Sequence, residues 1–180
     1  IERYRDGRNF VTNGPLLRFD VNGQPLGARI RVPAGLPYRA LLSAEVTARS
    51  PLARVEFVQN GQVIDSHEVP SGQTSFHAEK EVMVNKSCWF AARVTGQPAR
   101  GIPTGGTPRA HSGAIYVELG GRPTLIREDI ELMIRWVDRL WLYLEERNNL
   151  GPGNNRERAR KMFNQALEHY NSKLAQAQQP

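Results

Sequence analysis

The sequence lacks most of the features that assign a protein to a class at once. Cys88 is its only cysteine among 180 residues, so no disulfide can form within the chain and the redox compartment stays open. No stretch approaches the roughly 20 consecutive apolar residues of a membrane-spanning helix. No charged segment followed by an apolar one opens the chain, which starts abruptly at Ile1. We therefore expect a soluble part of a longer polypeptide, either cytoplasmic or exported from a bacterium, with no membrane partner.

Recurring motifs of catalysis are missing as well. The four histidines, His67, His77, His111 and His169, follow no metal-binding spacing, and no cysteine pair supports them. There is no Walker loop, no G-x-S-x-G elbow and no G-x-G-x-x-G after a strand. His67 and His77 fall on predicted strands, where we expect them at the surface. The sequence thus predicts no catalytic residue, no metal ligand and no cofactor in this chain.

The net charge of +6 does not indicate a nucleic-acid partner. Residues 1–122 hold 15 Lys and Arg against 10 Asp and Glu, and residues 123–180 hold 9 against 8. The surplus is mostly arginine placed singly along predicted strands, without the interleaved basic and aromatic runs of nucleic-acid readers. Scattered charge of this kind is typical of a solvated surface.

The strongest local signal is a β-hairpin over Leu52–Val69. Asn60-Gly61 is a type I′ turn sequence, since both residues tolerate positive φ, and runs rich in β-branched residues flank it. A regular register pairs Gln59 with Gln62, Val58 with Val63, Phe57 with Ile64 and Val55 with Ser66, and sets Glu56 opposite Asp65. Val55, Phe57 and Ile64 would then share one apolar face that needs a second sheet to cover it.

Further strands are predicted on both sides of this hairpin. Tyr38–Arg49 and Thr74–Val84 alternate between apolar and polar residues, as half-buried strands do. Ser87–Thr95 carries apolar residues on both faces, including Trp89, which indicates a central strand. With shorter strands near 17–21, 28–32 and 113–119, the sequence predicts a mainly β fold over residues 1–122. We expect an immunoglobulin-like β-sandwich of seven or eight antiparallel strands.

The composition changes at Pro123, and residues 123–180 predict an antiparallel helix pair packed on the sandwich. Thr124 is placed to cap a first helix from about Leu125, with Glu128 and Asp129 in its early turns. Trp136 and Tyr143 widen its apolar stripe, so we expect this helix to lie between the sandwich and the second helix. Gly151-Pro152-Gly153 separates it from that second helix, over Arg156–Ala177. Trp89, Trp136 and Trp141 are all expected to be buried.

One long connection is the candidate contact site. Residues 96–112 have no periodicity, and loops of this length tend to be functional or disordered. The candidate contacting residues are Arg100, Arg109, His111 and Ser112. The loop either contacts a partner domain or ligand, or is a connection without a role, and the sequence leaves both open.

Several ordered blocks of the chain resemble one family. They are GRNFVTNGPLLRFDVNG, PLARVEFVQNGQVI, CWFAARV and AHSGAIYVELGGRP, followed by two helices. Together they resemble the C-terminal region of CehA/McbA-type metallohydrolases, which are related to the PHP phosphoesterases. The resemblance implies that the metal-binding histidines and acids belong to an N-terminal PHP-like domain and that this region is its β-sandwich accessory. After Ala110-His111 this chain has Ser112-Gly113 where the family pattern has Thr-Ser-Pro.

These observations predict a non-catalytic accessory domain. Its partner would be the N-terminal PHP-like catalytic domain of the same polypeptide, which would bind a divalent metal, while its oligomeric state stays open. The alternative is a carbohydrate- or protein-binding β-sandwich module, which exposed aromatic residues in a row would favour. An independent enzyme is a third possibility that no residue set supports, and sandwiches as a class host many functions.

Overall fold

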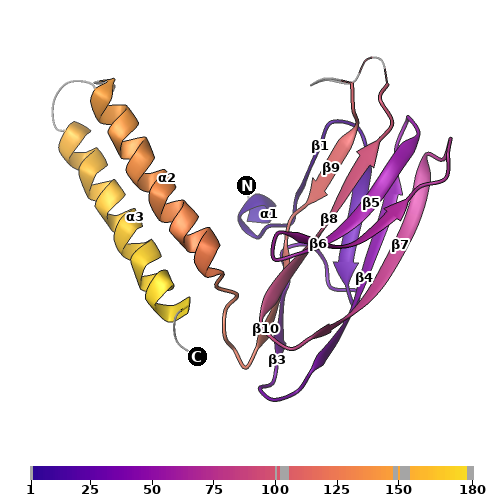
Figure 1. Ribbon diagram of the computed structural model, residues 1–180, viewed down its shortest axis with the longest axis horizontal. Helices are drawn as coiled ribbons and strands as arrows, with labels where there is room; N and C mark the ends of the chain where they lie inside the picture. The colour runs from indigo at the N-terminus through magenta and orange to yellow at the C-terminus, as the bar shows by residue number, and fades with distance from the viewer. Residues whose placement is uncertain (1, 100, 102–105, 148–149, 151–154, 178–180) are drawn as a thin grey trace. The chain divides into compact units, whose positions relative to one another are not determined.

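The strands form two sheets that lie face to face (Figure 1). The computed structural model describes residues 2–99, 101, 106–147, 150 and 155–177. By its contacts the chain divides into two units, residues 1–124 and 125–180. The elements of the first unit are α1 (Glu2–Arg5), β1 (Phe10–Thr12), β2 (Leu16–Val21), β3 (Arg29–Val32), β4 (Tyr38–Thr47), β5 (Leu52–Gln59), β6 (Gln62–Glu68), β7 (Ser75–Val84), β8 (Cys88–Gly96), β9 (Arg109–Ser112) and β10 (Ile115–Leu119). Those of the second unit are α2 (Arg127–Glu146) and α3 (Asn155–Ala177).

The predicted fold class, a mainly β immunoglobulin-like sandwich followed by two helices, is confirmed. One sheet has the order β2-β4-β7, and the other runs β6-β5-β8 and then splits, with β9 and β1 beside one half of β8 and β10 and β3 beside the other. Chain neighbours β4 and β5 lie in different sheets, as do β6 and β7, which gives the crossing connections of this sandwich class. Ten strands are described rather than seven or eight, and β3 pairs with β10 in parallel.

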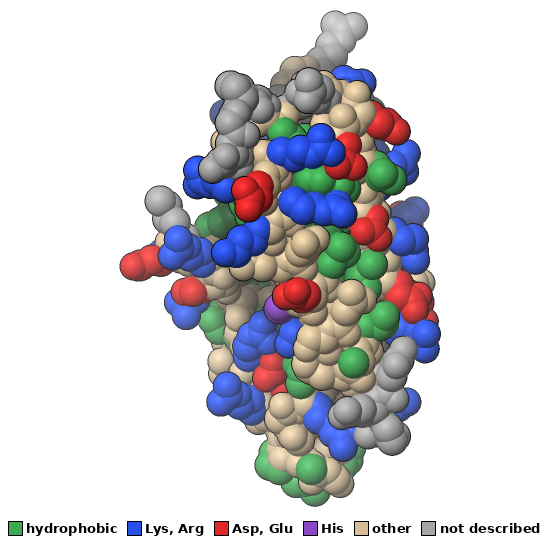
Figure 2. All heavy atoms as spheres, turned by 90° about the vertical axis from the view of Figure 1, so that its left-hand side faces the viewer, with side chains coloured by type: hydrophobic (Ala, Val, Ile, Leu, Met, Phe, Trp, Pro, Cys, Tyr) green, Lys and Arg blue, Asp and Glu red, His purple; other side chains and the backbone are tan. Residues whose placement is uncertain are grey.

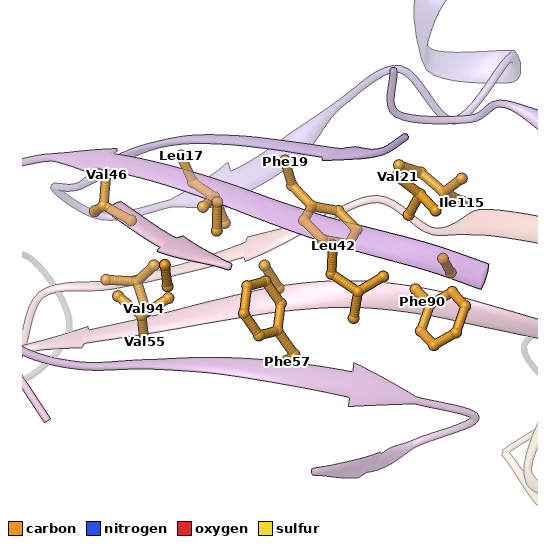
Figure 3. Close-up of a cluster of buried hydrophobic side chains, with 14 of the residues drawn as sticks. Leu17, Phe19, Val21, Leu42, Val46, Val55, Phe57, Phe90, Val94 and Ile115 are labelled. Atoms are coloured by element: carbon orange, nitrogen blue, oxygen red, sulfur yellow. The ribbon is translucent and has the colours of Figure 1, made fainter. Parts of the chain in front are cut away.

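The core fills the space between the two sheets (Figure 3). Alternate residues of β2 and β4 point inward from the smaller sheet and meet those of β5, β8 and β10 from the larger one. Phe19 and Phe57 have ring centroids 6.1 Å apart and bridge the two layers. Most of their labelled neighbours in the core are aliphatic, and Phe90 adds a third aromatic ring; the aliphatic ones are Leu17, Val21, Leu42, Val46, Val55, Val94 and Ile115. As predicted, β8 is a central strand, flanked by β5 on one edge and by β9 and β10 on the other.

The predicted hairpin is present, but its register is wrong beyond the second pair. Asn60 and Gly61 take positive φ, and Gln59–Gln62 and Val58–Val63 pair as expected. The register then shifts at Ile64, so Phe57 lies opposite Asp65 and Val55 opposite His67. A β-bulge of this kind turns the following side chains to the other face. Asp65 and His67 therefore face inward, and Asp65 does not oppose Glu56.

The helix pair of residues 125–180 is antiparallel and packs along α2 and α3 (Figure 1). Trp141 and Phe163 meet edge to face with centroids 5.2 Å apart, and Glu145 accepts a hydrogen bond of 2.7 Å from Arg156. Thr124 is not the cap of α2: the helix begins at Arg127, and Ile126 holds the cap position in an extended conformation without a side-chain hydrogen bond. Gly151-Pro152-Gly153 lies outside the described residues. No described helix is long and apolar enough to cross a membrane.

Candidate functional site

The predicted contact loop ends in a strand. Arg109–Ser112 forms β9, which pairs with β8 and β1 and was not predicted, because four residues are too few to show a clear alternation. Ala110 and Ser112 are buried, whereas Arg109 and His111 are exposed on the opposite face. Arg100 lies outside the described residues. The structure therefore does not bring Arg109, His111 and Ser112 together as one group.

Ser112 has a structural partner. Its hydroxyl oxygen accepts a buried hydrogen bond of 2.9 Å from the backbone N–H of Ala92. This bond lies where the pairing of β8 with β9 has ended and its pairing with β10 has not yet begun, so the side chain completes the ladder of β8 at the gap. The Nδ1 atom of His111 lies 2.7 Å from the Ser112 carbonyl oxygen, which can only accept, so Nδ1 carries the proton.

A hollow of about 580 Å³ lies nearby, between the N-terminal segment and the edge formed by β3 and β10. Its charged and aromatic lining consists of three arginines, one aspartate and one tyrosine, and glycines and alanines form the rest. The lining residues are Arg5, Asp6, Gly7, Arg8, Gly27, Ala28, Arg29, Ala114 and Tyr116. We call this hollow the arginine pocket.

Glycine allows the N-terminal segment to approach the sheet this closely. A Cβ atom on Gly27 would lie 1.8 Å from the carbonyl oxygen of Asp6, and one on Gly113 would lie 2.4 Å from that of Gly7. A backbone hydrogen bond from the Gly113 N–H to the Asn9 carbonyl holds this contact, and the Gly27 N–H donates to the Ala114 carbonyl beside it. One wall of the arginine pocket thus depends on positions where only glycine fits.

The arginine pocket has an excess of positive charge. Arg5, Arg8 and Arg29 line it with one carboxylate, that of Asp6, which lies 4.0 Å from Arg8 with both side chains exposed. The side chain of Arg29 is held in place by Glu118, to which it donates a 2.6 Å hydrogen bond; the Glu118 side chain is only 9% exposed. Its guanidinium also stacks over the ring of Tyr116, 4.5 Å from the centroid. Arg29 is therefore preorganised, which lowers the entropic cost of binding an anion there.

An aromatic pair adjoins the arginine pocket. Tyr116 and Trp89 lie directly opposite each other on β10 and β8, on the face turned away from the core. Both are half-buried, so the expectation that Trp89 is buried is only partly met. Trp141 is buried, but Trp136 is 58% exposed, which corrects the expectation for that residue.

Sequence reasoning missed a charged group on the inner side of the two sheets. Lys80, inward-facing on β7, lies 3.3 Å from Asp65 of β6, and His67 lies 3.4 Å from the same carboxylate oxygen without hydrogen-bond geometry. Burial alone would raise the pKa of Asp65, but hydrogen bonds from Lys80 and from the Ser66 N–H outweigh it and lower the pKa below 3.8. The His67 ring packs between Phe57 and Phe76, so it is not a plain surface residue. One sequence feature could have indicated this group: Lys80 occupies an inward-facing position of a strand that alternates between apolar and polar residues.

Several other charges on the larger sheet are paired. Glu56 accepts a 2.8 Å hydrogen bond from Arg93 and lies 3.7 Å from Arg54, which in turn donates to Glu68.

On the face shown in Figure 2, Lys and Arg side chains are interspersed with acidic and hydrophobic ones. Within the described ranges no three His, Cys, Asp or Glu side chains gather in a way that could hold a metal ion.

Comparisons with known proteins identify no family. No family model matches the chain, and no curated protein does. Among solved structures, fibronectin(III)-like modules of Clostridium thermocellum CbhA match at 18% identity over 56% of this chain and 93% of theirs, with a TM-score of 0.38. An engineered protein matches at 17% identity over 58% of this chain and 20% of its own, with a TM-score of 0.30. At this level neither likeness supports a statement about function.

Proposed function

We propose that this chain is a non-catalytic accessory module. The observation that carries the proposal is the placement of Ser112 and His111 on opposite faces of β9. The Ser112 hydroxyl is buried and engaged by the Ala92 N–H, so it is not available as a nucleophile. The His111 Nδ1 atom donates its proton to a backbone carbonyl, and among the described residues no acidic or basic side chain forms a hydrogen bond with the Ser112 hydroxyl.

We further propose that the module belongs to a PHP-related metal-dependent hydrolase. The support is the order of the sequence blocks that resemble the C-terminal region of CehA/McbA-type metallohydrolases. In this proposal an N-terminal catalytic domain of the same polypeptide binds the divalent metal, and the sandwich packs against it. The exposed side chains Arg109 and His111 of β9 are the candidate contacts to that domain.

An activity comparison tests the proposal. The 180-residue chain, incubated with Mn²⁺, Zn²⁺ or Fe²⁺, is expected to hydrolyse neither p-nitrophenyl phosphate, bis-p-nitrophenyl phosphate nor p-nitrophenyl acetate above the metal-only background. A longer chain that includes the PHP-like domain is expected to hydrolyse at least one of them. Metal-dependent turnover by the 180-residue chain itself would overturn the non-catalytic proposal.

The arginine pocket favours a second candidate function, a carbohydrate-binding module for acidic sugars. Guanidinium groups pair well with carboxylate and sulfate, and the Trp89–Tyr116 pair offers aromatic surface for a sugar ring beside them. The three arginines that line the arginine pocket come from α1, the segment after it and β3.

Ligand-induced stabilisation distinguishes this candidate. A polyuronate oligosaccharide is expected to raise the melting temperature, because a ligand that binds only the folded state stabilises it. A neutral oligosaccharide of the same length is expected to leave it unchanged. The variant Arg5→Ala/Arg8→Ala should lose the shift, while the control variant Arg18→Ala, at an exposed position of β2, should keep it. Equal shifts in both variants would reject the arginine pocket as the site.

A further inference from the structure

The first helix of the helix pair carries an exposed apolar stripe. The side chains of Leu132, Met133, Trp136, Leu140 and Tyr143 are between 41% and 58% exposed, with Trp136 the most exposed. At 3.6 residues per turn these five positions fall within about 100° of the circumference of α2. We call them the α2 stripe.

The α2 stripe is distinct from the face that α2 turns to α3. Ile130 and Trp141, the buried residues of α2, lie on that other side, where Trp141 packs against Phe163. The neighbouring Arg156–Glu145 ion pair also joins α2 to α3 there. The helix is thus apolar on two sides, and α3 covers one of them.

Two opposite charges stand at the ends of the α2 stripe. Asp129 precedes it by one turn and Arg147 follows it by one turn, and both point to the same side of the helix as the stripe. The Arg147 guanidinium confirms this, since it stacks over Tyr143 at 4.6 Å. Among the described residues neither forms an ion pair, whereas Arg127–Glu131 and Arg156–Glu145 do.

The spacing of these residues is symmetric about position 138. Asp129 and Arg147 are equally far from it, as are Met133 and Tyr143, and as are Trp136 and Leu140. If a second α2 lies antiparallel across the first with its midpoint at the same level, each residue meets its counterpart. Trp136 then packs on Leu140, Met133 on Tyr143, and both end charges find opposite partners.

We propose that α2 is a homodimerisation helix that docks antiparallel on α2 of a second copy of this chain. The contact is isologous, as in most two-fold dimers, because one self-complementary surface serves both copies. Two α2 stripes together bury on the order of 1,000 Å², near the lower limit of a specific interface, so we expect a micromolar dimer. The proposal concerns assembly and does not depend on the proposed accessory function.

Charge reversal tests the proposal directly. Asp129→Arg puts like charges together at both ends of the dimer, and so does Arg147→Asp, so each variant should dimerise at least tenfold more weakly in sedimentation equilibrium. The double variant Asp129→Arg/Arg147→Asp restores both pairs and should recover wild-type dimerisation. An equimolar mixture of the two single variants should form a heterodimer, since each supplies the charge that the other needs.

Matched controls reverse charges elsewhere on the same helix. Asp138→Arg and Arg135→Asp change the net charge equally but lie off the α2 stripe, so they should dimerise like the wild type. Trp136→Glu should be monomeric while keeping its far-ultraviolet circular dichroism spectrum. A wild-type chain that stays monomeric at 100 μM overturns the proposal. So does a dimer that the single reversals leave unchanged, because a parallel pairing or another surface would then form it.

Discussion

Two glycines of this protein share a backbone conformation but differ in their surroundings. Gly27 has φ +78 and Gly35 has φ +79, a region that L-residues rarely adopt. A Cβ atom on Gly35 would meet nothing within 4 Å, whereas one on Gly27 would collide with the Asp6 carbonyl. The pair separates the cost of left-handed backbone from the cost of steric overlap.

Gly35→Ala is expected to lower the free energy of unfolding by about 1–2 kcal/mol, the cost of a Cβ in the left-handed region. Gly27→Ala should either lower it clearly more or release the segment of residues 2–8 from the sheet. Urea denaturation measures the first effect, and hydrogen exchange of the Asp6, Gly7 and Arg8 amides measures the second. Equal stabilities with unchanged exchange would show that the segment does not depend on glycine at position 27.

The side chain of Ser112 replaces a missing backbone partner in the hydrogen-bond ladder of β8. The Ser112 hydroxyl oxygen accepts a hydrogen bond from the Ala92 amide, which the break between β9 and β10 would otherwise leave without a partner. Alternation along β9 sends the side chains of His111 and Ser112 to opposite faces, although the two residues are neighbours in the sequence.

At the scale of elements, the bulge in β6 links the two sheets through charge. By turning Asp65 and His67 inward, it places them next to Lys80 of β7, which belongs to the other sheet. A carboxyl group whose pKa is lowered by folding stabilises the folded state above its unfolded pKa, near 3.8. That contribution is lost as the pH falls through the lower, folded-state pKa.

Replacing Lys80 by Met is expected to raise the pKa of Asp65, since burial then acts without the lysine that opposes it. The difference in free energy of unfolding between wild type and Lys80→Met should be constant above about pH 5. It should shrink as the pH falls through the lowered pKa of Asp65 in the wild type, because a protonated Asp65 no longer pairs with Lys80. Carbonyl NMR titration of Asp65 measures the pKa directly.

Lys86→Met, which removes an exposed lysine in the connection between β7 and β8, is the control for the change of net charge. It should leave the Asp65 titration unchanged. An Asp65 pKa that is the same in the wild type and in Lys80→Met would contradict the assigned role of Lys80.

At the scale of the whole molecule, the chain consists of two units with different sources of stability. Residues 1–124 hold the continuous apolar core between the sheets, to which most of the buried strand residues contribute. Residues 125–180 bury mainly Ile130 and Trp141, and isolated helix pairs of this length are marginal in water.

A chain truncated after Thr124 is therefore expected to fold on its own, with a cooperative thermal transition and a β-type circular dichroism spectrum. Its melting temperature should lie within a few degrees of that of the 180-residue chain. A large loss of stability would instead support the prediction that the helix pair packs on the sandwich. Under the dimer proposal, the truncated chain should also be monomeric at every concentration.

The sequence by itself determined the features that depend on local pattern. The period of two in Tyr38–Thr47 and Ser75–Val84, the Asn60-Gly61 turn and the helical spacing after Pro123 each act within a few residues, so the fold class followed from them. The local pattern did not predict that Trp136 is exposed or that α2 starts without a side-chain cap, since burial and capping depend on what packs around a residue.

Only the tertiary structure decided the candidate sites. The arginine pocket joins residues 5–8 to Arg29 and Tyr116, which lie far apart in the chain, and close approach at Gly27 brings them together. The bulge at Ile64 changes which face Asp65 occupies, and the nearby Lys80 comes from the other sheet. Such contacts are decided by how the two sheets and the N-terminal segment pack. Residues that are far apart in the chain produce no periodic pattern that would predict their contact from the sequence.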